Sequence, residues 1–330
     1  ALLSALAAPA VAQTVTITGY TLPTANSSPG SIVKGPDGAL WFTRFLSKID
    51  RIDTSGAITE LTPTSNNGPY RMAAGSDGAL WYTEYYSSSI RRVTTAGAFS
   101  SFTTPGGGPL GITAGSDGAL WYTNPPGKIG RITTAGVASE FTLPTSGVGL
   151  EYIAAGPDGA LWFTEKTANK IGRISTGGAI AEFSDPTASS QPMDIVSGPD
   201  GALWFTEYNS DRIGRVSATG EFREYPVMRS AVGPVGIAAG PDGALWFTER
   251  PPGAGLARIG RITTGGVLTD YTVSTSVTAL DSIVAGPDGA LWFTDNNSAG
   301  AKIGKAVLSG FPASWAVAGL ADFTADNKKD

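Results

Sequence analysis

The sequence contains no cysteine and no histidine. Without cysteine there are no disulfides and no thiolate nucleophiles, and the two absences together exclude zinc sites with His or Cys ligands. The lack of histidine also excludes every catalytic triad that uses an imidazole as its base. Acid–base chemistry near neutral pH would therefore have to use Asp, Glu, Tyr, Lys or Arg in environments that shift their pKa values.

Positive charge is also scarce, because 23 Lys and Arg stand against 28 Asp and Glu and give a net charge of −5. This balance argues against a nucleic-acid partner, since nothing would neutralise a row of phosphates. No stretch beyond the N-terminus reaches the roughly 18 apolar residues of a membrane span. Residues 1–13 are small and apolar and end in Ala-Val-Ala-Gln, which is typical of the end of a secretory signal peptide, although an apolar strand or tail has the same composition. We therefore expect a chain that is secreted, periplasmic or displayed on the cell surface.

One motif, Gly-(Pro/Ser)-Asp-Gly-Ala-Leu-Trp-(Phe/Tyr)-Thr, occurs seven times. The spacings between its tryptophans are 40, 40, 41, 42, 42 and 46 residues. This period predicts the blades of a β-propeller. The tryptophans are Trp41, Trp81, Trp121, Trp162, Trp204, Trp246 and Trp292.

Each repeat predicts four short strands. An apolar strand leads into the Pro-Asp-Gly turn, and Ala-Leu-Trp-Phe-Thr forms the second strand. A Lys-Ile-Gly-Arg-Ile segment, as at 128–132, forms the third, and Ser139–Thr142 is typical of the fourth. The last repeat lacks a fourth strand, but residues 20–24 resemble residues 141–145. We therefore predict an all-β, seven-bladed propeller over residues 14–310 whose N-terminal strand completes the last blade and removes an exposed edge.

The C-terminal segment, residues 311–330, breaks the repeat. Gly-Leu-Ala-Asp-Phe followed by spaced oxygen side chains resembles the first repeat of FG-GAP (integrin-type) calcium-binding propellers, although that loop usually has Gly where Asn327 stands. Ca²⁺ prefers six to eight oxygen ligands from a tightly curled loop. The segment is interpreted either as the start of a second domain or as an acidic tail. Its candidate Ca²⁺ ligands are Asp322, Thr324, Asp326 and Asp330.

Two positions of each repeat are expected to meet at a rim around the channel mouth, because the loops on either side of them share one face of a propeller. The first follows Trp-aromatic-Thr, where a residue repeated in register is also typical of the hydrogen bonding of the blade itself. It reads Arg44, Glu84, Asn124, Glu165, Glu207, Glu249 and Asp295. The second lies at the entry to the first strand, and its residue type varies from repeat to repeat. Such variation is expected of a ligand-specific surface and also of a loosely constrained loop. This position reads Gly30, Tyr70, Leu110, Glu151, Met193, Val235 and Asp281, and its next neighbours are Ser31, Arg71, Gly111, Tyr152, Asp194, Gly236 and Ser282.

The expected ligand-binding rim thus comprises Arg44, Tyr70, Arg71, Glu84, Asn124, Glu151, Tyr152, Glu165, Asp194, Glu207 and Glu249. Two blades carry acid at both positions, Glu151 with Glu165 and Asp281 with Asp295. Such pairs suit Mg²⁺ or Ca²⁺, or the sharing of one proton. The arginines would orient a polar or anionic ligand, and the tyrosines offer flat surfaces for sugars or aromatic rings.

The repeat resembles that of the virginiamycin B lyase (streptogramin lyase) family, with Gly-Pro-Asp-Gly-Ala-Leu-Trp-Phe-Thr-Glu, then Lys-Ile-Gly-Arg-Ile, then Glu-Phe-Thr-Leu-Pro-Thr. The resemblance implies Mg²⁺-assisted ring opening of a cyclic depsipeptide by elimination, with a histidine base and acidic metal ligands. In the last blade, the position of that histidine is Asp281, and the metal-binding acid two residues before it is Ala279. The acid after Trp-Phe-Thr is retained as Asp295.

Two functions follow from these observations. We expect a monomeric extracellular binding module that holds a glycan, small-molecule or protein ligand at the rim, with no zinc, haem or nucleotide. The alternative is an enzyme, either a divalent-metal-dependent lyase or a lactone or ester hydrolase, in which Asp281 and Asp295 would be catalytic or hold the metal. An inert structural spacer is a third interpretation, against which the varied rim argues.

Overall fold

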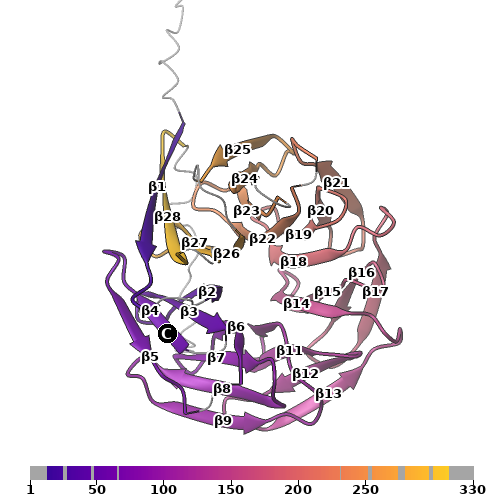
Figure 1. Cartoon of the computed structure of the whole chain (residues 1–330). Helices are drawn as coiled ribbons and strands as arrows, with labels where there is room; N and C mark the ends of the chain where they lie inside the picture. Colours follow the sequence, from indigo (N-terminus) through magenta and orange to yellow (C-terminus); the bar gives the residue numbers. More distant parts are fainter. Residues whose placement is uncertain are drawn as a thin grey trace, which may run out of the picture.

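The computed structural model describes residues 13–24, 28–45, 48–64, 67–230, 232–251, 255–273, 279–296 and 300–311. These residues form seven antiparallel four-stranded sheets, the blades of a propeller. The first strand of each blade lies nearest the centre and the fourth lies at the perimeter (Figure 1). The predicted fold class is thus confirmed.

Six blades take their strands in chain order. Blade 1 comprises β2 (Ser28–Lys34), β3 (Leu40–Phe45), β4 (Lys48–Ile52) and β5 (Ile58–Leu61). Blade 2 comprises β6 (Pro69–Ala74), β7 (Ala79–Glu84), β8 (Ser89–Thr94) and β9 (Phe99–Thr103). Blade 3 comprises β10 (Ile112–Ala114), β11 (Leu120–Asn124), β12 (Lys128–Ile132) and β13 (Ala138–Thr142). Blade 4 comprises β14 (Leu150–Ala155), β15 (Leu161–Glu165), β16 (Lys170–Ile174) and β17 (Ile180–Ser184). Blade 5 comprises β18 (Pro192–Ser197), β19 (Leu203–Glu207), β20 (Arg212–Val216) and β21 (Phe222–Pro226). Blade 6 comprises β22 (Pro234–Ala239), β23 (Leu245–Glu249), β24 (Arg258–Ile262) and β25 (Leu268–Thr272).

Blade 7 joins the two ends of the chain. It comprises β26 (Leu280–Ala285), β27 (Leu291–Asp295), β28 (Lys302–Ser309) and β1 (Thr14–Thr21). β1 pairs with β28 along its whole length, and Tyr20 stacks on Trp292 with ring centroids 5.6 Å apart. The predicted closure by the N-terminal strand is therefore confirmed, and it gives β28 a hydrogen-bonded neighbour on its outer edge (Figure 1).

The repeated motif explains how each blade turns. In blade 6, Gly243 has a φ of +74°, a left-handed conformation that glycine adopts at little cost. Asp242 accepts hydrogen bonds from Trp246 Nε1 at 2.8 Å and from Arg261 Nε at 2.7 Å. The Pro-Asp-Gly turn, the tryptophan of the second strand and the arginine of the third are thereby held together.

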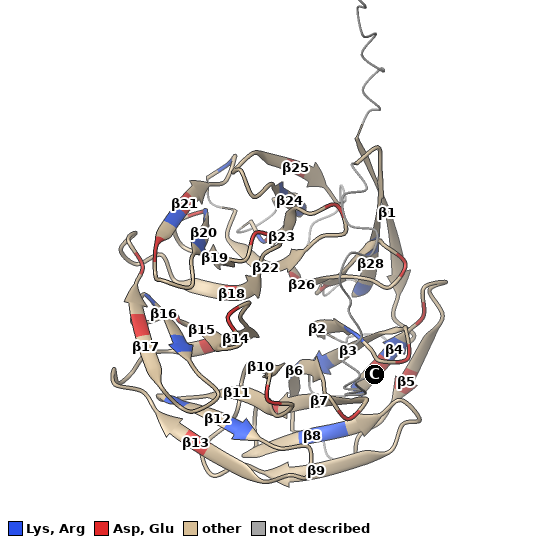
Figure 2. Cartoon of the chain, turned by 180° about the vertical axis from the view of Figure 1, so that it is seen from behind, with Lys and Arg blue, Asp and Glu red and all other residues tan. Residues whose placement is uncertain are grey.

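The core lies between the blades, where the seven motif tryptophans are fully buried. In blade 3 the ring of Trp121 stacks on Phe141 of the fourth strand at 5.5 Å. A Cβ atom on Gly130 would lie 1.9 Å from the Tyr122 ring, which explains the glycine of the third strand. At the perimeter, basic residues of the third strands face acidic residues of the fourth (Figure 2), as in the 2.7 Å ion pair of Lys128 with Glu140.

Beyond β28 the chain crosses to blade 6, where Phe311 packs against Trp246 and Tyr271 at centroid distances of 5.8 and 6.4 Å. The expected signal-peptide remnant, apart from Gln13, lies outside the described residues. Residues 312–330, with the proposed Ca²⁺ ligands Asp322, Thr324, Asp326 and Asp330, also lie outside them. Within the described part of the chain, no helix has the length and apolar character needed to cross a membrane.

Candidate functional site

A β-bulge in the first strand turns one side chain of a blade toward the central channel. In blade 4 the pairing of β14 with β15 shifts between Leu150 and Ile153, so that two residues, Glu151 and Tyr152, oppose Thr164 alone. Such a bulge bends the strand and redirects its side chains. Blades 1, 2, 5, 6 and 7 have the same shift at the same place.

The threonine of each Trp-aromatic-Thr motif fixes this geometry. In blade 3, Thr123 Oγ1 accepts a hydrogen bond from the Gly111 N–H at 2.8 Å and donates one to the Glu151 carbonyl of blade 4 at 3.0 Å. The bond within the blade recurs in all seven blades. The bond to the following blade recurs in six. Each bulge is therefore tied to its own second strand and, in those six, to the next blade.

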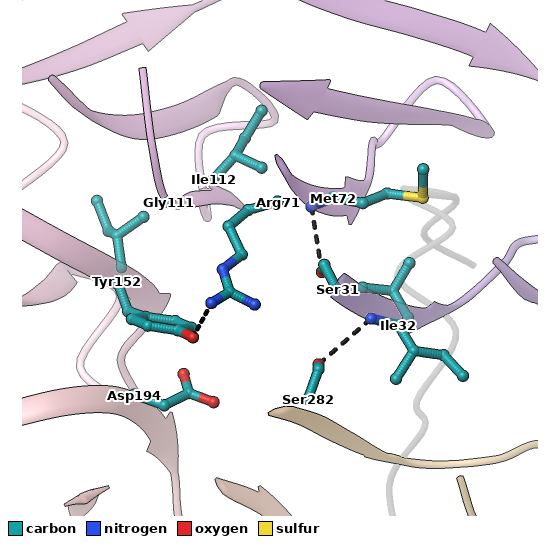
Figure 3. Close-up of a pocket in the computed structure, with 11 residues that line it drawn as sticks. Ser31, Ile32, Arg71, Met72, Gly111, Ile112, Tyr152, Asp194 and Ser282 are labelled. Carbon is teal, nitrogen blue, oxygen red and sulfur yellow. Dashed lines mark hydrogen bonds between the residues drawn. The ribbon is translucent and has the colours of Figure 1, made fainter. Parts of the chain in front are cut away.

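One residue from each blade contributes to a ring around the channel. In six blades it is the second residue of the bulge, and in blade 3 it is the equivalent residue in the register. This channel ring consists of Ser31, Arg71, Gly111, Tyr152, Asp194, Gly236 and Ser282. All except Gly236 line a pocket of about 120 Å³ that extends to Ile32, Val33, Met72, Ile112 and Ile153. Ser31 Oγ accepts from the Met72 N–H and Ser282 Oγ from the Ile32 N–H, so neighbouring blades are also joined at this level (Figure 3).

Arg71 is the largest charged group of the channel ring, and its side chain is only 8 % exposed. Its Nη2 donates to the Tyr152 hydroxyl (Figure 3). Its Nη1 lies 3.4 Å from Asp281 Oδ2. The guanidinium carbon lies 4.3 Å from the Tyr152 ring centroid and 4.7 Å from that of Tyr70. Burial opposes the charge of Arg71, but Asp281 and the two tyrosines hold its pKa above the usual value. Its Nε has no hydrogen-bond partner among the described residues.

Asp194 approaches the pocket from blade 5. Its Oδ1 accepts from the Ile195 N–H at 2.9 Å, and its Oδ2 accepts from the Ile237 N–H of blade 6 at 3.0 Å. Burial raises the pKa of Asp194 to about 7 despite these bonds and the charge of Arg71. The charge of the pocket therefore changes close to neutral pH.

The other two acids of this region have basic partners. Asp281 lies between Arg71 and Arg250, whose Nη2 is 3.9 Å from Asp281 Oδ1. Glu151 Oε1 lies 3.5 Å from Lys166 Nζ. Arg250 and Lys166 both stand one residue after the Trp-Phe-Thr-Glu motif, a position that sequence reasoning overlooked. That position also varies from blade to blade, and this variation is the signal that would have found it.

Four aromatic side chains from blades 1 and 2 form a cluster beside Arg71. This aromatic cluster consists of Phe45, Tyr70, Tyr85 and Tyr86, with ring centroids between 5.0 and 6.3 Å apart. Tyr85 and Tyr86 are 44 % and 62 % exposed. Because Tyr70 also contacts the Arg71 guanidinium, the exposed rings continue into the channel ring.

The structure places the residues after Trp-aromatic-Thr elsewhere, inside the blades and their interfaces. Arg44, Glu84, Asn124, Glu165, Glu207 and Glu249 are all buried. Arg44 pairs with Asp50 and Glu60, Glu84 with Arg91, and Asn124 with Glu140. Asp295 is partly buried, opposite Lys302 in the strand ladder. The pocket lining includes none of this set.

The predicted carboxylate pairs consequently have different surroundings. Glu151 contacts Lys166, whereas Glu165 is fully buried, and burial and then the charge of Glu182 raise the pKa of Glu165 to about 7. Asp281 faces two arginines. Of the predicted rim, the structure therefore brings Tyr70, Arg71, Tyr152 and Asp194 together, with the predicted catalytic or metal residue Asp281 beside Arg71.

A family model and the solved structures point to the same family. Residues 15–231 and 153–319 match the model of the Virginiamycin B lyase family. A solved structure of a streptogramin B lyase is 36 % identical, with a TM-score of 0.83 over 89 % of this chain and 98 % of the other. A catalytically inactive histidine-to-alanine variant of virginiamycin B lyase from Staphylococcus aureus, solved with quinupristin, is 33 % identical, with a TM-score of 0.83 over 90 % and 100 % of the two chains. YCF48 from Cyanidioschyzon merolae, 14 % identical with a TM-score of 0.70 over 88 % and 98 %, shares the fold. No curated protein matches the chain.

Proposed function

Because the chain belongs to the virginiamycin B lyase family, we propose that it is a binding member of that family, one that holds a polar ligand at the channel mouth and does not open streptogramin rings. The ligand has a carboxylate or a similar hydrogen-bond acceptor that meets Arg71. It also has a flat sugar or aromatic face that meets the aromatic cluster.

The observation that carries this proposal is the state of Arg71. Its guanidinium is buried and charged, and its Nε donor lacks a partner among the described residues. An unpaired buried donor is costly, and a ligand acceptor would remove that cost. The pocket of about 120 Å³ has room for a small charged group, since about 10 to 15 Å³ of such cavity volume is enough to hold one water molecule.

The surroundings of Asp281 support binding over elimination. An elimination needs a base and an electrophile that stabilises the developing negative charge. The resemblance to the family implies that Asp281 stands in place of the histidine and Ala279 in place of a metal-binding acid. Arg71 and Arg250 already face Asp281 and would repel a divalent cation there. The residues present therefore do not fit the Mg²⁺ that the family implies, and we derive no catalytic step through it.

The alternative is a divalent-metal-dependent lyase, or a lactone or ester hydrolase, that works without histidine. The identity of 36 % over 98 % of a streptogramin B lyase favours it. In that case Asp281 and Asp295 would be the first candidates for the base and the metal ligand. Export from the cell and a monomeric state remain predictions under either function.

Incubation of the purified chain with quinupristin and Mg²⁺, followed by liquid chromatography and mass spectrometry, separates the two functions. Ring opening by elimination leaves the mass unchanged and alters retention and fragmentation, whereas hydrolysis adds one water. We expect intact quinupristin. A ring-opened product that is lost in Asp281→Asn would overturn the proposal and establish the enzyme.

Binding is tested by calorimetry with benzoate and glucuronate, which combine a carboxylate with a flat ring or a sugar. We expect binding that Arg71→Gln weakens at least tenfold, because a buried charged donor is lost. Arg131→Gln is the matched control, since Arg131 pairs with Asp117 at the turn beside the tryptophan of blade 3. Equal affinities in the two variants would place the site elsewhere.

A further inference from the structure

Three carboxylates meet between blades 4 and 5, and none of them belongs to the channel ring. Asp185 follows β17 of blade 4, Glu207 ends β19 and Glu224 lies on β21. Each offers an oxygen within 4.8 Å of the oxygens of the other two. We call these residues the carboxylate cluster.

Positive charge does not balance the carboxylate cluster. The ion pair found there joins Arg212 Nη1 to Glu224 Oε2 across 3.8 Å. The equivalent place in blade 4 holds two acids, Glu165 and Glu182, and Lys170 contacts Glu182 at 2.9 Å. The carboxylate cluster therefore has one more acid, contributed by blade 4, and a more distant cation than the equivalent place in blade 4.

One oxygen of the carboxylate cluster is buried without a partner. Glu207 is fully buried, and its Oε2 accepts from Ser210 Oγ at 2.6 Å. Its Oε1 is also buried and receives no hydrogen bond from any described residue. Burial, reinforced by Asp185, raises the pKa of Glu207 to about 8, and burial raises that of Asp185 to about 6. An unpaired buried carboxylate oxygen requires a proton or a cation to offset its burial.

The third acid is not required by the architecture of the blade. Leu143 and Val227 stand in the place of Asp185 after the fourth strands of blades 3 and 5, and both are buried. In all three cases the N–H donates to the carbonyl of the residue before the third strand, at 2.9 to 3.0 Å. The backbone bond is the same with an apolar residue, so it does not need the carboxylate of Asp185, which accepts instead from the Thr187 N–H at 3.1 Å and from Ser190 Oγ at 2.6 Å.

We propose that the carboxylate cluster binds one divalent cation, and that Ca²⁺ fits it best. All the donors are oxygens, which hard cations prefer, and three carboxylates with one guanidinium leave about two negative charges to neutralise. Ca²⁺ fits better than Mg²⁺, because Mg²⁺ usually keeps several waters and this site is largely buried. The ion would join the outer end of blade 4 to blade 5 and thereby stabilise the propeller.

The test compares the full wild-type chain with Asp185→Leu, which installs the residue that stands in the same place after blade 3. Chelator-treated protein is titrated with CaCl₂ at pH 7.5 by calorimetry, and the thermal midpoint is measured with and without Ca²⁺. We expect Asp185→Leu to bind one Ca²⁺ fewer per chain. A wild-type rise of about 5 °C at saturating Ca²⁺ should disappear in that variant.

Two control variants separate this site from the others. Glu165→Gln changes the equivalent acid of blade 4, and Asp281→Asn changes the channel mouth, so both should keep the cation and the thermal shift. Counting the difference in bound ions removes any contribution from residues 312–330, which every variant retains. Equal Ca²⁺ stoichiometry in wild type and in folded Asp185→Leu would overturn the proposal and mean that the three carboxyls share protons instead.

Discussion

The hydroxyl of the Trp-aromatic-Thr threonine has two hydrogen-bond roles, as donor and as acceptor, at the same buried place. Thr123 accepts from the Gly111 N–H just before the first strand of blade 3 and donates to the first strand of blade 4. At this place the regular strand ladder does not provide hydrogen-bond partners for both the neighbouring N–H and the neighbouring C=O. A residue without a hydroxyl would therefore leave these two groups unpaired. This explains why threonine recurs in all seven motifs although the channel residues beside it differ.

Replacing this hydroxyl should destabilise the propeller. Thr123→Val keeps the shape but leaves a buried N–H and a partly buried C=O without partners, which we expect to lower the free energy of unfolding by about 2 to 4 kcal/mol. Urea unfolding followed by tryptophan fluorescence measures the change. Thr123→Ser keeps the hydroxyl and is the control. A Val variant as stable as the Ser variant would mean that the bonds between blades contribute little.

Glu165 provides a second test at the residue scale. The pKa of Glu165 is about 7 in the folded chain and 4.5 ordinarily. Between pH 4.5 and pH 7, Glu165 is therefore protonated in the folded chain and ionised in the unfolded chain. Its stabilising contribution is thus present below about pH 4.5 and disappears as the pH rises through 7. Relative to Glu165→Gln, the wild type should lose about 2.5 kcal/mol of unfolding free energy between pH 5 and pH 8. A difference between the two proteins that stays constant over this range would contradict the assignment.

Among the strands, β1 is the element that contributes most to closing the ring. Its pairing with β28 joins the two ends of the described chain, Tyr20 covers Trp292, and the nearby Leu22 is buried. The sequence predicted this closure because the last repeat lacked a fourth strand and a matching segment preceded the first repeat. Counting the predicted strands was sufficient here, because a propeller whose last blade lacked its fourth strand would have an exposed strand edge.

Removal of β1 should therefore cost more than removal of what precedes it. A chain that starts at Ser28 loses Tyr20 and Leu22, and its thermal midpoint should be at least about 10 °C below that of a chain that starts at Gln13. Differential scanning calorimetry measures the shift, and size-exclusion chromatography reports association through the exposed edge of β28. A synthetic peptide of residues 13–24 should restore part of the midpoint by adding the strand back. Equal midpoints for the two chains would refute the closure argument.

At the scale of the whole molecule, the sequence repeat predicted the fold better than it predicted the candidate functional site. Period and strand count follow from local sequence, so the fold could be derived from them. The direction of the side chains could not, because the bulge sends Tyr152 into the channel while Glu165, on the adjoining strand, enters the interior of the blade. The carboxylate cluster was missed for a related reason, since Asp185 and Glu207 belong to different blades and no repeat position links them.

The buried acids together predict how the stability of the whole propeller depends on pH. Burial raises the pKa values of Asp50, Glu165, Asp185, Asp194, Glu207 and Glu249 to between about 6 and 8. These groups favour the folded state at low pH, and their contribution is lost as the pH rises toward 8. Asp117 and the equivalent turn aspartates Asp37, Asp77, Asp158, Asp200 and Asp288 have lowered pKa values, so their contribution is lost as the pH falls below about 4.

Stability should accordingly be greatest near pH 5 and decrease by pH 8 in the presence of a chelator, by more than the roughly 2.5 kcal/mol expected for Glu165 alone. Urea midpoints at pH 3.5, 5, 6.5 and 8 measure the profile. Repeating the pH 8 measurement in CaCl₂ should recover part of the loss in wild type but not in Asp185→Leu, because there the cation replaces the protons that the carboxylate cluster gives up. A midpoint that rises steadily from pH 5 to pH 8 without Ca²⁺ would show that the buried carboxyls are ionised at little cost, which would contradict the raised pKa values.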